Sequence, residues 1–136
     1  MDSVKVINFR LHEDINGKLC AYESDGQVPF NIKRVFTVTA QNEDIRGNHA
    51  HIHCTQLMVC VSGSLVVSCD DGINKQNFNL TNMNVGLLIP PLIWCRQQYG
   101  MNGSVLMVMC DRFYNPDDYI YDYNTFKNLT SSSRTK

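Results

Sequence analysis

The sequence lacks the features that would place the protein in a membrane or on a nucleic acid. No apolar run approaches the roughly 18 residues that a membrane-spanning helix requires, so we expect no membrane partner. Residues 1–5 have no basic start leading into an apolar core, so we expect no signal peptide and a cytoplasmic protein. A positive surplus is also missing, because 12 Lys and Arg stand against 13 Asp and Glu. Nucleic-acid coating proteins carry such a surplus, so we expect no nucleic acid partner.

Long helical patterns are scarce, and short β-like runs take their place. Turn residues recur at intervals of about eight to twelve positions, which is typical of an all-β sandwich or barrel. The runs cover residues 4–10, 18–23, 32–39, 56–61, 64–69, 77–80, 86–89, 92–99 and 104–110. Asn115 and Pro116 form a capping signal that predicts one short helix over residues 117–126. We predict a single domain over residues 1–129, followed by a Ser- and Thr-rich tail, 130–136, that frays.

The cysteines lack the spacing of a redox or zinc motif. There are six, none forms a CxxC pair, and all lie within apolar, strand-like runs. A reducing cytoplasm makes disulfides rare, so we expect six thiols that act mainly as small core hydrophobes.

Three of the four histidines are clustered, at positions 49, 51 and 53. Side chains alternate between the faces of a strand, so His49, His51 and His53 share one face if the segment stays extended. Protonating one imidazole disfavours protonating its neighbour, which makes a functional site a better explanation than a polar strand face without function. His12 stands alone and is expected to be structural.

The histidines begin a pattern, H-x-H-x4-Q-x6-G, that resembles the first metal-binding motif of the cupin barrels. Cupins use a Glu where this chain has Gln56, and a later His where it has Cys95. Two His, one Cys and one Gln can still hold zinc, but a site without its carboxylate favours no metal. Gln56 is five residues from His51, so both share one face only if a bulge or turn lies near Cys54 and Thr55.

Several motifs together resemble a narrower family, the sugar 3,4-ketoisomerases. They are V28-P-F-x-I-K-R-V-F36, R46-G-x-H-A-H51, V59-C-V-S-G-S64, G86-L-x-I-P-P-x-x-W94 and D111-x-F-Y-x-x-D-D-Y-I-x-D-Y-x-x-F126. The resemblance implies a cupin double-stranded β-helix, a homodimer with exchanged strands, and no metal or other cofactor. It also implies a dTDP-4-keto-6-deoxyglucose substrate and a 3-keto product used for surface glycans such as O-antigen lipopolysaccharide or S-layer sugars.

The proposed chemistry suits the histidines. Moving a ketone from C4 to C3 needs a base for the C3 proton, an enediol intermediate and proton delivery to C4, and histidine titrates in the right range. We assign His51 as the carbon base, His49 as its proton-shuttling partner, and His53 to the barrel mouth or an interface. The expected substrate-binding residues are Arg46, Gln56, Arg96, Thr37, Tyr99 and Cys95.

Three positions depart from the family pattern. Thr37 replaces a Tyr, Cys95 replaces a His or Arg, and Asn16 replaces an Arg before a turn glycine. Because of these departures, the resemblance does not determine the contacts to the sugar and the nucleotide. It does not determine the C4 configuration of the product either.

Two alternative functions, from other classes of cupin, stay open. A metal-dependent cupin oxygenase or isomerase predicts stoichiometric iron or zinc and loss of activity to a chelator. A non-catalytic cupin that binds a nucleotide sugar predicts binding without turnover, although binding alone needs no pair of bases.

Overall fold

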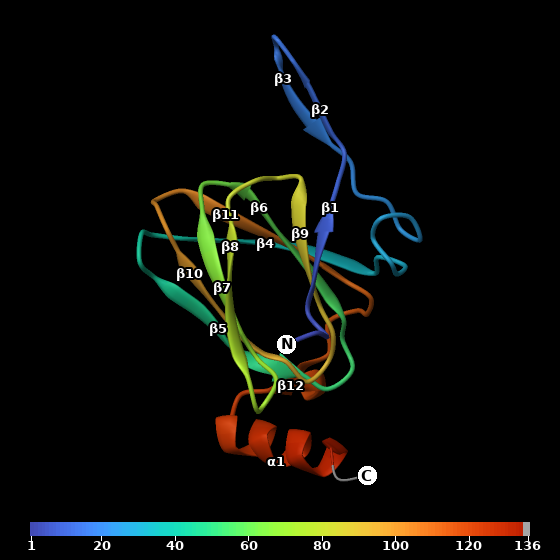
Figure 1. The fold of residues 1–136 in the computed structure, drawn as a ribbon, viewed down its shortest axis with the longest axis vertical. Coiled ribbons are helices and arrows are strands. Elements are labelled where there is room, and N and C mark those ends of the chain that lie inside the picture. Colours follow the sequence, from blue (N-terminus) through green and yellow to red (C-terminus); the bar gives the residue numbers. More distant parts are fainter. Residues whose placement is uncertain (135–136) are drawn as a thin grey trace.

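Two five-stranded antiparallel sheets face each other and form the body of the molecule in a computed structural model that describes residues 1–134 (Figure 1). The first sheet consists, in spatial order, of β1 (Lys5–Asn8), β9 (Val85–Ile89), β6 (Gln56–Ser62), β11 (Ser104–Cys110) and β4 (Arg34–Ala40). The second consists of β12 (Tyr119–Ile120), β5 (Ile45–His51), β10 (Trp94–Tyr99), β7 (Leu65–Asp70) and β8 (Lys75–Leu80). The all-β prediction is confirmed.

Strand alternation fills the space between the sheets. Along β10, Cys95, Gln97 and Tyr99 are buried, whereas Arg96 and Gln98 are exposed. The inward side chains form the main core, which includes Met58, Cys60, Leu65, Val67, Cys69, Leu87, Cys95, Tyr99, Leu106, Val108 and Cys110. All six cysteines lie in the described part of the chain and are free, and five are buried, as expected of small core hydrophobes.

A second core lies on the outer face of the first sheet. Leu57, Val59 and Met109 point away from the barrel interior and pack against Phe9 and Val28. The irregular segment of residues 21–33, which precedes β4, supplies Val28 and further side chains of this cover.

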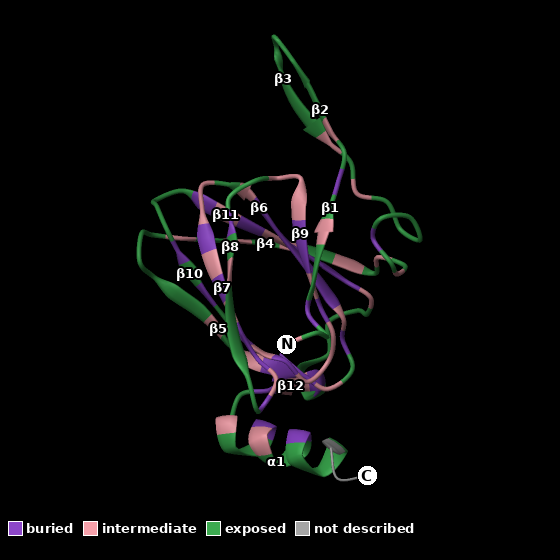
Figure 2. Ribbon diagram, viewed as in Figure 1, coloured by how far each residue is buried: buried purple, intermediate pink, exposed green. Residues whose placement is uncertain are grey.

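A two-stranded hairpin, β2 (Leu11–Asp14) with β3 (Gly17–Cys20), projects from the barrel (Figure 1). It is mostly exposed (Figure 2), including Leu19 at 59% and Ile15 at 99%. Apolar side chains held so far into solvent are consistent with a strand-exchanged dimer, which stays a prediction.

The C-terminal segment differs from the sequence-based expectation of a helix over residues 117–126. The Asn115 side chain caps a 3-10 turn, Pro116–Asp118, which leads directly into β12. The α-helix α1 begins only at Tyr123 and extends to Arg134, with Phe126 packed on the outer face of the second sheet. The helix therefore includes residues 130–134 of the expected frayed tail, and residues 135–136 lie outside the described residues.

No helix within residues 1–134 is long and apolar enough to cross a membrane.

Candidate active site

His49 and His51 face the barrel interior from β5, near the edge of the second sheet. Their ring centroids lie 5.1 Å apart and their planes are nearly perpendicular, at 85°. Between them, Ala50 faces outward and packs beneath α1 with Ile120 and Phe126. The predicted alternation is thus confirmed for these two histidines. It does not extend to His53, which lies beyond the end of β5 and is exposed.

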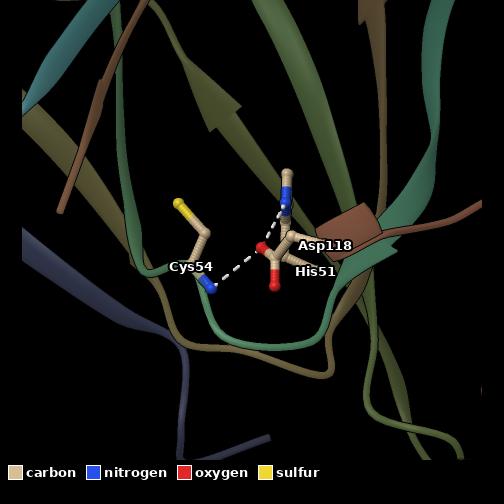
Figure 3. Close-up of side chains that lie close together, drawn as sticks. All are labelled: His51, Cys54 and Asp118. Carbon is tan, nitrogen blue, oxygen red and sulfur yellow. Dashed lines mark hydrogen bonds and ion pairs between the residues drawn. The ribbon is translucent and has the colours of Figure 1, made fainter. Parts of the chain in front are cut away.

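Asp118 holds the His51 ring in place. Its Oδ2 lies 3.2 Å from His51 Nδ1 and accepts the Cys54 backbone N–H at 3.2 Å (Figure 3). Its Oδ1 accepts the His53 backbone N–H at 2.8 Å. A carboxylate in this position fixes the tautomer that carries its proton on Nδ1. Nε2 is then left with a free lone pair, and it is buried without a hydrogen-bond partner among the described residues. An imidazole held this way can act as a general base.

Burial favours the neutral form of both imidazoles. It lowers the pKa of His51, and the neighbouring His49 lowers it further, while the hydrogen bond to Asp118 opposes both effects. Burial also lowers the pKa of His49. Because the charged form is disfavoured in an apolar site, both rings can accept a proton at neutral pH.

A tyrosine and an arginine that are not among the predicted site residues complete the surroundings of the pair. Tyr119 lies opposite His51 in the β12–β5 ladder, with ring centroids 4.3 Å from His51 and 5.0 Å from His49. Arg34, from the edge strand β4 of the other sheet, donates to the Tyr119 hydroxyl at 3.3 Å. Its guanidinium also lies 4.5 Å from the Phe36 ring centroid. The two residues connect the sheet edges beside the histidines.

Three of the predicted binding residues do line the interior. Gln56 is buried at the start of β6, and its Nε2 donates to Cys110 Sγ at 3.6 Å. The chain turns between β5 and β6 near Cys54, as the spacing required. Cys95 lies directly opposite His49, and Tyr99 is fully buried with a hydroxyl that has no partner among the described residues.

Arg46 also faces inward, owing to a bulge. Its strand partner is the buried Gln97, whereas that of His49 is Cys95, and the register shifts between them. Gly47 (φ 92°) and Asn48 (φ 60°) absorb the extra residue in left-handed conformations. A Cβ on Gly47 would also lie 3.1 Å from the Cys95 carbonyl oxygen and 3.2 Å from Arg96 Cα, so this position strongly favours glycine. Arg46 therefore shares the inner face with Gln97, but its side chain is exposed, and it lies toward Tyr99 rather than beside His51.

Arg96 and Thr37, two of the predicted binding residues, do not share the inner face with the histidines. Arg96 lies between the inward Cys95 and Gln97, so strand alternation places it on the outer face of the second sheet. Thr37 lies between the inward Phe36 and Val38 and is exposed on the outer face of the first sheet.

Comparison with known families identifies the chain. A sequence model of the FdtA family, described as WxcM-like, C-terminal, matches residues 2–131. The chain belongs to the FdtA family.

Relatives of this FdtA-family protein are sugar nucleotide isomerases. It is 39% identical over 124 residues to a TDP-4-oxo-6-deoxy-alpha-D-glucose-3,4-oxoisomerase of Aneurinibacillus thermoaerophilus, covering 90% of this chain and 89% of the relative. The sugar 3,4-ketoisomerase QdtA of Thermoanaerobacterium thermosaccharolyticum, solved with TDP, superposes with a TM-score of 0.94 at 29% identity over 98% of each chain. A 3,4-ketoisomerase of Helicobacter canadensis superposes with a TM-score of 0.91 at 32% identity, over 96% and 98% of the chains. The predicted cupin fold and isomerase class are confirmed.

The residues of the FdtA-family site do not fit a divalent metal well. His51, Cys54 and Asp118 bring potential ligand atoms within 4.8 Å of one another. The Asp118 oxygens, however, already accept three N–H groups. The hydrogen bond with Cys110, together with burial, raises the pKa of the Cys54 thiol, so it stays protonated and is a weak ligand. Hydrogen bonding explains this cluster without an ion.

The lowered histidine pKa predicts the pH dependence of the reaction. A base must be neutral to accept a proton, and a pKa below the ordinary 6.5 keeps His51 neutral into mildly acidic solution. We expect kcat/KM to stay level through neutral pH and to fall on an acidic limb centred below 6.5. A profile of kcat/KM between about pH 5 and 8 checks this, and a limb centred above that value would contradict it.

Proposed function

We propose that this enzyme converts TDP-4-keto-6-deoxyglucose into a TDP-linked 3-keto-6-deoxyhexose. The observation that carries the proposal is the buried His51, with Nδ1 against Asp118 and Nε2 unpartnered beside His49. The substrate class comes from the relatives, whose names specify TDP-4-oxo-6-deoxyglucose isomerisation and binding of TDP.

The reaction moves protons with no net gain or loss by the substrate. His51 Nε2 removes the proton from C3, which the C4 carbonyl acidifies, and O4 gains a proton to give the enediol. The O3 proton then leaves as C3 becomes the ketone, and a proton is delivered to C4. His49, 5.1 Å from His51 between ring centroids, is positioned to move the hydroxyl protons between O4 and O3. Neutral Gln56 supplies a hydrogen bond to a sugar hydroxyl without adding charge.

A single assay tests this function. The purified chain is incubated with TDP-4-keto-6-deoxyglucose, and the sugar ring is followed by NMR. We expect the C4 ketone signal to be replaced by a C3 ketone, and the product spectrum assigns the C4 configuration. Binding of the substrate without any conversion would instead favour the non-catalytic alternative.

Arg34 is the best placed cation for the diphosphate. Its guanidinium lies at the histidine site, whereas Arg46 lies further along the barrel and Arg96 lies on the far side of the sheet. Arg34→Ala is expected to weaken TDP binding by about 1–3 kcal/mol, the scale of hydrogen bonds to charged groups. Calorimetry with TDP at two ionic strengths measures the loss and its salt dependence.

Lys33→Ala is the matched control, because it removes the same charge from the exposed neighbouring residue. Arg46→Ala tests the arginine on β5 in the same way. If Arg34→Ala keeps its TDP affinity and Arg46→Ala loses affinity, Arg46 rather than Arg34 binds the diphosphate.

The metal-dependent alternative predicts a different protein after purification. Because Gln56 and Cys95 replace two cupin ligands and Asp118 is engaged by N–H groups, we expect well under one metal per chain by elemental analysis. EDTA should leave turnover unchanged. Reproducible one-to-one iron or zinc, with activity lost to the chelator, would favour the oxygenase or metal isomerase.

Assembly and cellular role complete the proposal. We infer a homodimer that exchanges strands through the exposed β2–β3 hairpin, where Leu19 is 59% exposed. Light scattering of the full chain tests it, since a monomeric mass would contradict it. The reaction belongs in the cytoplasm, where its product supplies deoxysugars for surface glycans.

A further inference from the structure

A polar cavity lies on the outer face of the second sheet, on the side opposite to the histidines. Its volume is about 460 Å³, and its lining includes Asn48, Ser68, Lys75, Trp94, Arg96 and Tyr123. Small-molecule pockets in proteins begin at a few hundred Å³, so the cavity can hold a monosaccharide phosphate or a small nucleotide.

The sheet register builds this cavity. Arg96 on β10 is opposite Ser68 on β7, which is opposite Asn77 on β8. In the next outward-facing row, Trp94 is opposite Asp70, and Asp70 is opposite Lys75. Side chains two residues apart share a face, so both rows point away from the barrel interior. Tyr123 closes the end of the cavity from the first turn of α1, where its hydroxyl donates to Asp70 Oδ2 at 2.6 Å.

The cavity is rich in unpaired donors. Neither Lys75 nor Arg96 forms an ion pair with any residue among 1–134. Asp70, the acid in the lining, is buried and already accepts the Tyr123 hydroxyl and the Gly72 N–H, at 2.6 and 2.7 Å. The two cations therefore leave an excess of positive charge in the cavity.

The amide of Asn77 adds to this set of donors. Ser68 donates its hydroxyl to Asn77 Oδ1 at 2.7 Å, which leaves Asn77 Nδ2 free to donate. A guanidinium, an ammonium and an amide around one cavity match the oxygens of a phosphate group.

Aromatic rings form the remaining wall. Trp94 and Tyr123 pack edge to face with ring centroids 5.3 Å apart, and Lys75 Nζ lies 6.0 Å from the Tyr123 ring centroid. An apolar wall beside a cationic rim favours a ligand that joins a ring to an anionic group. We propose that this cavity is a second ligand site, which binds a phosphate ester of a sugar or nucleoside.

The site is separate from the histidine pair. β10 lies between β5 and β7 within the sheet, so a ligand on its outer face cannot pass between strands to the inward His49 and Cys95. A ligand in the cavity therefore does not contact the substrate atoms that react at the histidines. A binding measurement can test the cavity independently of turnover.

Trp94 provides a local readout, because it is the only tryptophan in the chain. The full chain is titrated at constant ionic strength with glucose 1-phosphate, thymidine monophosphate, inorganic phosphate and, as a blank, sodium chloride. We expect a saturable change in tryptophan emission with an ester, and Arg96→Ala or Lys75→Ala should weaken that binding at least about tenfold. Arg96→Lys, which keeps the charge, should retain part of the affinity.

Arg34→Ala separates the two sites, since it removes the guanidinium beside the histidines and should leave this titration unchanged. A stronger response to glucose 1-phosphate identifies a sugar ligand, and a stronger response to thymidine monophosphate identifies a nucleoside. The proposal is overturned if no ester saturates the signal or if inorganic phosphate binds as tightly as both esters. It is also overturned if Arg96→Ala and Lys75→Ala, each shown folded by circular dichroism, bind like the wild type.

Discussion

Replacing His51 with Asn is expected to lower the turnover of TDP-4-keto-6-deoxyglucose by on the order of 100-fold or more, the usual contribution of a positioned base. An Asn amide still places a donor near the Asp118 carboxylate, which His51 Nδ1 approaches to 3.2 Å in the wild type. The fold and TDP affinity should therefore survive. The substitution removes Nε2, the group that we propose accepts the C3 proton.

Deuterated water separates loss of the base from loss of binding. The wild type should introduce deuterium at C4 of the product and at C3 of recovered substrate, and His51→Asn should introduce neither. His53→Asn is the matched control, because that side chain is exposed two residues further on and should leave turnover and exchange intact. Wild-type turnover in His51→Asn would remove this residue from the mechanism.

The parts of the site that follow from local sequence were predictable. His49 and His51 share a face because they are two residues apart on one strand, and this needs no knowledge of the fold. The same rule separates Arg96 from the histidine face. Cys95 and Arg96 are adjacent on β10, so they cannot both face the interior, and only Cys95 does.

The remaining parts depend on long-range pairing that a single sequence does not show. Asp118 lies 67 residues from His51, and the bond between Arg34 and Tyr119 spans 85 residues. Both require β12 to pair with β5, yet β12 has only two residues and carries no periodic signal. The capping signal at Asn115 was real, but it opens a 3-10 turn rather than the helix. Similarly, the inward position of Arg46 depends on the bulge at Gly47 and Asn48, which breaks the alternation.

Asp118→Asn is expected to lower kcat by about 10- to 100-fold with little change in KM. In our proposal Asp118 orients the His51 ring and does not contact the sugar. The carboxylate also raises the pKa of His51 against the lowering effects of burial and of His49. Removing it therefore lowers the pKa of His51 further. The acidic limb of kcat/KM should move to lower pH, whereas a purely structural defect would reduce activity without moving that limb.

Asp117→Asn provides the control for this prediction, because it neutralises an exposed carboxylate in the same 3-10 turn. It should retain wild-type kcat and an unshifted acidic limb. The Asp118→Asn substitution also turns an amide toward the His53 and Cys54 backbone N–H groups, which in the wild type donate to the Asp118 oxygens at 2.8 and 3.2 Å. Thermal unfolding of each variant is therefore measured alongside. If Asp118→Asn is folded at the assay temperature and keeps both kcat and the position of the limb, Asp118 does not position His51 for catalysis. If it loses kcat and the limb shifts to lower pH, the carboxylate acts through the imidazole, as the geometry requires.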